Sequence, residues 1–317
     1  MTARAALALA ALLAAAPAVA GPDAGAPPAD GVFERARVEV APGKHPIHAV
    51  TIENALGDVR VEGHDGKGVV ILAMKRAPDD AALDRLRVSL VPDPDGAVRI
   101  VTAVDGGREA VPVARSAVRI DLVIQAPRDA RVIGRVEDGK LVLVNMDAGG
   151  ELDTGGGAIT VENVSGSVTT RSLAGAQSLQ QVFGSVDAEA LDANLTLDTI
   201  RGDRLTAAVH DGRIDSRRVK SRSVELRSTR GNITFDGDAT PGGQLVIASL
   251  RGDIAVTIRT FARVQIHTSG AHVVAAAGGR PIDGGGTEYG TGPRPTAIEL
   301  RSRFGDIQFA LVETGTR

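Results

Sequence analysis

Apolar and polar residues alternate along much of the chain, in a short pattern that returns around successive glycines. Around Gly231, the residues seven and five positions before it and two and four after it are apolar: Val224, Leu226, Ile233 and Phe235. The same offsets are apolar around three further glycines: Gly57, Gly252 and Gly305. A spacing of two is the side-chain period of a strand with one buried face. Each copy therefore predicts a strand, a tight glycine turn and a second strand.

The glycines also recur at a nearly constant step. Those at 157, 166, 175 and 184 lie nine residues apart, and those at 202, 212, 231 and 252 follow at roughly one or two times that step. Such a step favours a coil whose rungs stack, because one rung cannot bury its apolar face alone. We therefore predict an all-β fold, a single-stranded β-helix or β-solenoid. Antiparallel hairpins in a β-sandwich are the alternative that the pattern also fits.

The N-terminal third has strand-like segments at irregular spacing. Alternation predicts strands at 32–40, 48–63, 69–76 and 117–127, and a pair across a Pro-Asp-Gly turn at 87–104. Residues 79–87 form the only helix-like piece. We predict an N-terminal β-rich cap or lead-in at 32–130, solenoid repeats at 131–311 and a tail at 312–317. A Gly/Pro-rich insertion at 269–295 should be mobile or capping, with a binding loop as the less favoured alternative, and AIELRSRFGDIQFAL should then close the coil.

The first residues predict export. Residues 1–20 carry Arg4, an apolar run and the small-residue end Ala18-Val19-Ala20, as in a secretory signal peptide, and 21–31 resemble a flexible leader. The chain has no cysteine, so neither a lipid anchor nor disulfides are expected. We expect an exported protein that is periplasmic, outer-envelope-associated or extracellular, with no membrane span after signal cleavage. The net charge of -3 indicates no nucleic-acid surface.

Several of these features together resemble a bacterial putative-adhesin family of unknown function, related to the head GIN domains of auto-transporter adhesins. They are ALGDVRVEG, the strand AVRIDLVIQAP, the Gly-polar turns at 166–167, 184–185, 231–232 and 252–253, and the closing IELRSRFGDIQF. The resemblance spans about residues 33–311 and implies a right-handed β-helix-like fold, export and no established activity. Arg204 departs from the pattern, since an apolar residue is expected there after Gly202; a register shift that turns Leu205 inward would repair it.

Two motifs invite a binding interpretation. Arg-Gly-Asp occurs at 201–203 and 251–253, where turn chemistry already accounts for it, as at Gly57-Asp58 and Gly305-Asp306. Six aspartates could stack into a calcium ladder: Asp187, Asp203, Asp215, Asp236, Asp253 and Asp306. The chain lacks the aspartate-dense nonapeptide of calcium-binding solenoids, so solvated turn residues are the preferred interpretation. His45 and His48 flank Pro46 and should point opposite ways, which does not favour a metal pair.

The densest ionisable run could serve a carbohydrate-active enzyme. It consists of Asp198, His210, Asp211, Arg213, Asp215, Arg217 and Arg218. Aromatic platforms for sugars are scarce, and a solvated charged face is the preferred interpretation. We expect no catalytic, metal or cofactor site. The leading hypothesis is a non-catalytic, adhesin-like or envelope-associated interaction module with an unidentified protein or polysaccharide partner. The alternatives are a β-helix enzyme acting on an acidic polysaccharide and a self-associating envelope protein.

Overall fold

The structure is a computed structural model that describes residues 31–105, 117–260, 263–269, 272–277, 280–281, 287–289 and 294–313. The predicted signal peptide and all but the last residue of the leader lie outside these residues, as does much of the 269–295 insertion. The described part is built almost entirely of strands, with one helix of four residues. The all-β prediction is therefore confirmed.

The N-terminal elements follow the predicted segments closely. They are β1 (Val32–Val40), β2 (Ala49–Leu56), β3 (Val59–His64), β4 (Val69–Ala77), α1 (Asp80–Leu83), β5 (Leu86–Pro92), β6 (Ala97–Val104) and β7 (Arg119–Pro127). The helix is shorter than the predicted 79–87. Asp79 caps its start by accepting a hydrogen bond from the Ala82 backbone N at 2.7 Å. It ends early because Leu86, buried in the core, already belongs to a strand.

The central elements are nine successive strands. They are β8 (Arg131–Asp138), β9 (Leu141–Val144), β10 (Gly150–Thr154), β11 (Ile159–Ser165), β12 (Val168–Ala174), β13 (Gln177–Phe183), β14 (Val186–Asp192), β15 (Leu195–Asp211) and β16 (Ile214–Arg230). The C-terminal elements are β17 (Ile233–Asp238), β18 (Gln244–Ser249), β19 (Ile254–Thr260), β20 (Val264–Ser269), β21 (Val273–Ala277), β22 (Arg280–Pro281), β23 (Thr287–Tyr289), β24 (Thr296–Ser302) and β25 (Ile307–Glu313).

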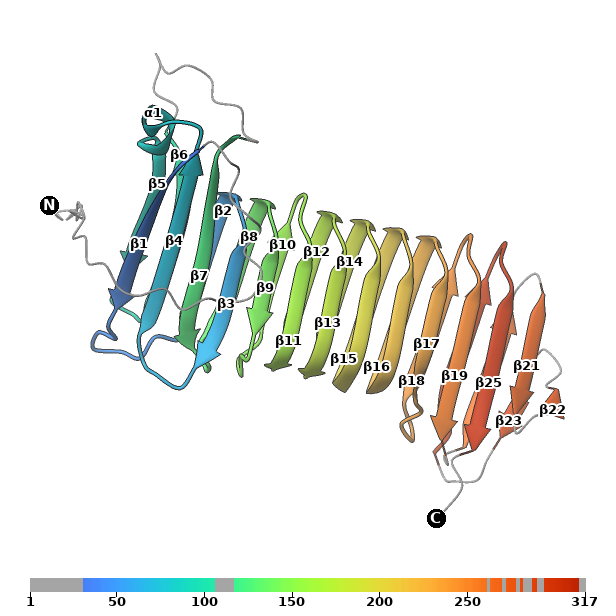
Figure 1. Ribbon diagram of the computed structural model, residues 1–317. Helices are drawn as coiled ribbons and strands as arrows, with labels where there is room; N and C mark the ends of the chain where they lie inside the picture. The colour runs from blue at the N-terminus through green and yellow to red at the C-terminus, as the bar shows by residue number, and fades with distance from the viewer. Residues whose placement is uncertain are drawn as a thin grey trace, which may run out of the picture.

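From β8 onward the chain alternates between two stacks of parallel strands. Stack A runs through β6, β2, β8, β10, β12, β14, the second halves of β15 and β16, β18, β24 and β20. Stack B runs through β7, β3, β9, β11, β13, the first halves of β15 and β16, β17, β19, β25 and β21. Figure 1 shows stack B in front. Because β15 and β16 belong to both stacks, all strands join one 25-stranded sheet that folds back on itself.

Between residues 131 and 260 every strand pair is parallel, even where the two strands follow each other in the sequence. Partner residues lie 18 to 21 positions apart, a distance along the chain that we call one rung. Val168 of β12 pairs in parallel with Val186 of β14, and Val224 of β16 pairs in parallel with Leu245 of β18. The strand–glycine–strand units of this region are therefore not hairpins. The two facing layers fit both solenoid and sandwich at the level of fold class. Aliphatic side chains from both layers meet in one continuous core.

The corners between the stacks explain the glycines. One corner leads from stack A to stack B and contains the glycines at 57, 139, 157, 175, 212, 231, 252 and 305; we call it corner 1. A Cβ on Gly231 would lie 1.8 Å from the carbonyl oxygen of Gly212, so only glycine lets successive corners stack this closely. Corner 2 leads from stack B back to stack A and contains Gly166, Gly184 and Gly202.

A small polar residue three positions before the corner-1 glycine stabilises several of these turns. The Gly157 backbone N donates to Thr154 Oγ1 at 3.1 Å, and the Gly305 N donates to Ser302 Oγ at 2.9 Å. Both polar side chains are buried. They give the turn amides a hydrogen-bond acceptor, so these amides do not incur the cost of being buried without a partner. The residue after the glycine adds a link between rungs, since Asp253 Oδ1 accepts from the Asp306 backbone N at 2.9 Å.

Two departures from strict alternation keep the core filled. Leu205 is fully buried and Arg204 is exposed, so the predicted register shift is confirmed; Leu205 and not Arg204 pairs with Val186 of the neighbouring rung. A second departure is a column of residues with positive φ, one per rung on stack B: Asn145, Asn163, Gln181, Thr199 and Arg218. Each forms a bend that turns residues three apart inward, as with Val161 and Val164.

The last copy of the pattern does not close the coil as predicted. β24 pairs with β18 on one side and β20 on the other, and β25 lies between β19 and β21. Figure 1 shows β25 inserted between β19 and β21. The reason is the corner-1 column, in which Gly305 stacks directly on Gly252. The first copy is inserted likewise, with β2 between β6 and β8.

Candidate functional site: a groove on stack A

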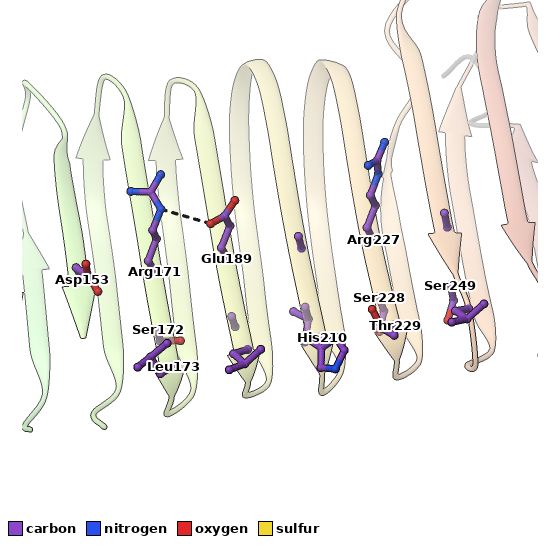
Figure 2. Close-up of a pocket in the computed structure, with 16 residues that line it drawn as sticks. Asp153, Arg171, Ser172, Leu173, Glu189, His210, Arg227, Ser228, Thr229 and Ser249 are labelled. Atoms are coloured by element: carbon purple, nitrogen blue, oxygen red, sulfur yellow. Dashed lines mark hydrogen bonds and ion pairs between the residues drawn. The ribbon is translucent and has the colours of Figure 1, made fainter. Parts of the chain in front are cut away.

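A groove crosses the outer face of stack A beside corner 1. It has a volume of about 790 Å³ and is lined by residues from β10, β12, β14, β15, β16 and β18. It therefore runs along the stacking direction and crosses the strands. Figure 2 shows its polar residues spread over these successive rungs.

The shape of the groove follows from two rows of outward side chains. In the first row, each rung contributes the outward side chain four positions before its corner-1 residue. Ala208 and Ala248 belong to this row, and their small side chains leave space between longer neighbours. The second row, two positions before the corner-1 residue, contains Leu173, Leu191 and Leu250, which form an apolar lip and are 62%, 52% and 38% exposed. Apolar side chains in such a row are costly to leave in water, so the lip favours a covering ligand.

Charged groups line the opposite side. Arg171 lies between Glu151 and Glu189, with nitrogen–oxygen distances of 3.5 Å and 3.4 Å. Figure 2 shows its pair with Glu189. Arg227 pairs with Glu225 of its own strand. Each of these pairs is partly exposed and contributes little to stability. They leave planar guanidinium groups at the edge of the groove, suited to binding polar groups on a ligand.

One buried hydroxyl bordering the groove has no partner among the described residues. Ser228 is 7% exposed, and its Oγ makes no hydrogen bond there. The equivalent Ser249 one rung along donates to the Gly231 carbonyl at 3.3 Å. The Ser228 Oγ atom is itself buried, so it borders the groove without being exposed to a ligand in it.

The candidate enzyme residues do not form one cluster, although the structure pairs Asp198 with Arg218 and Asp215 with Arg213. His210 alone among them lines the groove. Asp198, Asp215, Arg217 and Arg218 lie on the stack B halves of β15 and β16, whereas Asp211 and Arg213 flank corner 1. Three of the carboxylates are held by arginine: Asp198 by Arg218, Asp211 by Arg230 at 2.8 Å and Asp215 by Arg213 at 2.7 Å.

The aspartates of the possible calcium ladder are also dispersed. Asp187 lies on stack A, Asp203 at corner 2, Asp215 and Asp236 on stack B, and Asp253 and Asp306 at corner 1. Within the described ranges, no three His, Asp or Glu side chains are close enough to hold a metal ion. Asp236 is bound by Arg259, and this hydrogen bond raises the pKa of Arg259 above its usual value although burial lowers it. His45 and His48 are both exposed.

The two Arg-Gly-Asp triplets occupy different corners. Residues 251–253 lie at corner 1, as predicted from the neighbouring glycine turns. Residues 201–203 lie at corner 2 within the continuous strand β15. The prediction that both triplets lie at the same kind of glycine turn is therefore wrong. The reason is that the two corners alternate along the chain, and the spacing of glycines alone does not separate them.

Apart from His210, the groove residues escaped the sequence analysis. The available signal was an apolar residue directly after the buried serine, as in Ser172-Leu173 and Ser249-Leu250, where alternation predicts an outward polar residue. Ala208 and Ala248 gave no signal, since alanine fits either face.

Comparison with known proteins gives structural neighbours only. No family model matches the chain, and no curated protein matches it. Among solved structures, it is similar to a putative lipid binding protein from Parabacteroides distasonis, at 12% identity over 89% of this chain and 97% of the other, with a TM-score of 0.38. It is also similar to a putative adhesin from Bacteroides fragilis, at 14% identity over 89% of this chain and 97% of the other, with a TM-score of 0.36. It is similar as well to a putative adhesin from Parabacteroides merdae, at 11% identity over 88% of this chain and 96% of the other, with a TM-score of 0.33. Similarity at this level assigns no function to this chain. In the described residues, no helix has the length and apolar character to cross a membrane.

Proposed function

We propose that this chain is an exported, non-catalytic interaction module, adhesin-like or envelope-associated, which binds an extended ligand in the stack A groove. The observation that carries the proposal is the groove itself, with an exposed leucine lip and arginines opposite. A ligand lying along the stacking direction would cover the lip and reach the arginines. A long rigid surface of this kind is what repeat folds offer to partners.

The proposal includes the finer fold description. We class the chain as a right-handed β-solenoid, supported by parallel pairing of strands one rung apart between residues 131 and 260. Residues 32–130 would act as an N-terminal cap, since β4 pairs antiparallel with β1 and β7, and β5 pairs antiparallel with β6. The signal peptide and leader would direct export to the periplasm, envelope or exterior.

The arrangement of carboxylates supports a non-catalytic role. The two carboxylates that line the groove are Asp153 and Glu189, on β10 and β14. Arg171 of β12 lies between them and pairs with Glu189. A glycosidase instead needs the scissile bond between its two carboxyl groups.

A matched pair of variants on β15 tests the groove. Ala208→Gln fills the hollow, whereas Thr206→Gln changes the outward neighbour on the same strand and face, which does not line the groove. Binding is measured on arrays of bacterial and host glycans and on immobilised matrix proteins. The proposal predicts a probe that binds wild type and Thr206→Gln but binds Ala208→Gln at least tenfold more weakly. It fails if no probe binds, or if both variants bind as wild type does.

Export has a separate test. The intact mass of the protein recovered from the extracytoplasmic fraction should correspond to cleavage after Ala20. Recovery of the full-length chain in the cytoplasm alone would contradict the localisation.

A further inference from the structure

A cluster of basic side chains lies on β15 and β16 between the stack B bend and corner 2, away from the groove. We call it the basic corner and define it by six exposed residues of β15 and β16: Arg201, Arg204, Arg217, Arg218, Lys220 and Arg222. The whole chain has a net charge of -3, so the positive charge here is local.

The backbone holds these residues at fixed spacing. β15 and β16 are the two 17-residue strands that continue through corner 2, and they pair in parallel along most of their length. Arg201 is the register partner of Lys220, and Arg204 that of Ser223. Neighbouring strands lie about 4.8 Å apart, so Arg201 and Lys220 stand side by side.

Few of the cations at the basic corner have a carboxylate partner. Elsewhere, arginines such as Arg99, Arg171 and Arg263 have carboxylate partners. At the basic corner, Arg218 pairs with Asp198. For the other five, the structure shows no ion pair within the described ranges: Arg201, Arg204, Arg217, Lys220 and Arg222.

Nearby acidic residues offset this charge only in part. Asp203 is adjacent to Arg204, and Asp238 follows the β17 residue that pairs with Val219. Asp236 of β17 lies beside Arg217 and Arg218 but already pairs with Arg259. With Asp198 there are thus four carboxylates, one of them held elsewhere, against six cations. Like charges on neighbouring strands repel each other, so the cluster lowers stability unless an anion neutralises it.

The column of Arg201 and Lys220 ends at an exposed aromatic ring. Phe183, 43% exposed, is the register partner of Arg201 on β13. Three successive rungs therefore present a ring and then two cations in one row. Carboxylate or sulfate groups along a linear chain would meet the cations, and a sugar ring could pack on Phe183.

We propose that the basic corner binds a linear acidic polysaccharide. The inference rests on the proposed function, because it names one ligand class for the interaction module, but it uses a surface separate from the groove. Single-stranded nucleic acid normally stacks on several aromatic side chains, and the basic corner has one. An anionic membrane normally binds a basic amphipathic helix or juxtamembrane segment, whereas this cluster lies on two strands.

The test uses two variants with the same change in charge. Arg201→Gln, Arg204→Gln and Lys220→Gln together remove three charges from the basic corner. Arg87→Gln, Arg131→Gln and Arg135→Gln together remove three exposed charges elsewhere. Affinity for polygalacturonate and for heparin is measured by titration calorimetry at two salt concentrations. Uncharged dextran, single-stranded DNA and vesicles containing phosphatidylglycerol serve as comparison probes.

We expect wild type and the control variant to bind an acidic polysaccharide and not dextran, with affinity that falls as salt rises. The basic-corner variant should lose at least tenfold in affinity. An equal loss in both variants, no binding by wild type, or tighter binding to DNA or vesicles would overturn the proposal.

The two proposals fail separately. Ala208→Gln should leave polygalacturonate affinity unchanged, because the groove is a different surface. Loss of polysaccharide binding in Ala208→Gln but not in the basic-corner variant would assign the polysaccharide to the groove and overturn this inference alone. Failure of all probes with wild type would contradict both.

Discussion

At the scale of single residues, the fold depends on glycines whose missing side chain lets one corner lie on the next. At corner 1, the backbone carbonyl of each rung occupies the space that a Cβ would need in the next. The small polar residue three positions earlier then satisfies turn amides. Sequence spacing located these glycines, and the close carbonyl contact gives the physical reason for them.

Replacing a corner glycine should therefore be costly. In Gly231→Ala, the new Cβ would lie 1.8 Å from the Gly212 oxygen, so the two rungs must separate. We expect a loss of about 3 kcal/mol and a fall in the thermal midpoint of about 6–12 °C. Gly43→Ala is the control, since no atom lies within 4 Å of its added Cβ. Equal midpoints for the two variants, measured by circular dichroism, would contradict the stacking.

A buried polar network also acts at this scale. Gln177 takes a core position that aliphatic residues hold in neighbouring rungs, and it is 1% exposed. Its Oε1 accepts from Thr170 Oγ1 at 2.7 Å, and its Nε2 donates to Ser172 Oγ at 2.8 Å.

Removing one side chain of the Gln177–Thr170 pair should cost more stability than removing both. Gln177→Leu leaves the Thr170 hydroxyl buried without an acceptor, and we expect a loss of about 1–3 kcal/mol. Adding Thr170→Val should recover at least half of it, because the unpaired hydroxyl is gone. Chemical denaturation measures both variants. A double variant less stable than the single would show that the network does not act through unpaired burial.

At the scale of elements, the column of positive-φ residues sets where each stack B strand bends. Asn163 Nδ2 donates to Asn145 Oδ1 at 2.7 Å, so two rungs are also linked through side chains. Gln181 continues the column with a φ of 53°, a conformation that costs most residues about 1–2 kcal/mol and asparagine less.

We therefore expect Gln181→Asn to stabilise the protein by about 0.5–1 kcal/mol. Gln181→Val should destabilise it by about 1–2 kcal/mol, because a β-branched residue tolerates this conformation least. Both are measured as shifts of the urea midpoint at constant m-value. A stabilising Gln181→Val would show that the strand does not bend there.

Many of the strands could be predicted from the sequence, but the bends within them, the groove and the basic corner could not. Strict alternation located strands such as β2, β6 and β7. The bends remained hidden because an apolar pair spaced by three, such as Val161 and Val164, breaks the period of two. The groove was also hidden, since it arises from side-chain size along a column, which joins residues a full rung apart in the sequence. Of the basic corner, the sequence analysis named only Arg217 and Arg218, as part of the ionisable run; the place of Arg201 beside Lys220 required the register.

At the scale of the whole molecule, the order of rungs differs from the order of the sequence at both ends. The last copy, β24 and β25, lies one rung inside the C-terminal end, and β20 and β21 lie outside it.

Hydrogen exchange followed by mass spectrometry should show β25 amides protected nearly as well as those of β19, and β21 amides exchanging faster, because terminal elements open most readily. Faster exchange in β25 than in β21 would contradict this order.

The central claim is that outward columns are built from residues one rung apart. Because the chain has no cysteine, spin labels can be placed at single introduced cysteines along stack B. Thr160 connects through Ser178, Thr196, Asp215 and Thr234 to Ala255, and then to Gln308. Pulsed electron resonance should give about 24 Å for Thr160–Ala255 and about 29 Å for Thr160–Gln308, at about 4.8 Å per rung. Distances that do not increase along this series, as in two sheets of hairpins, would contradict the account.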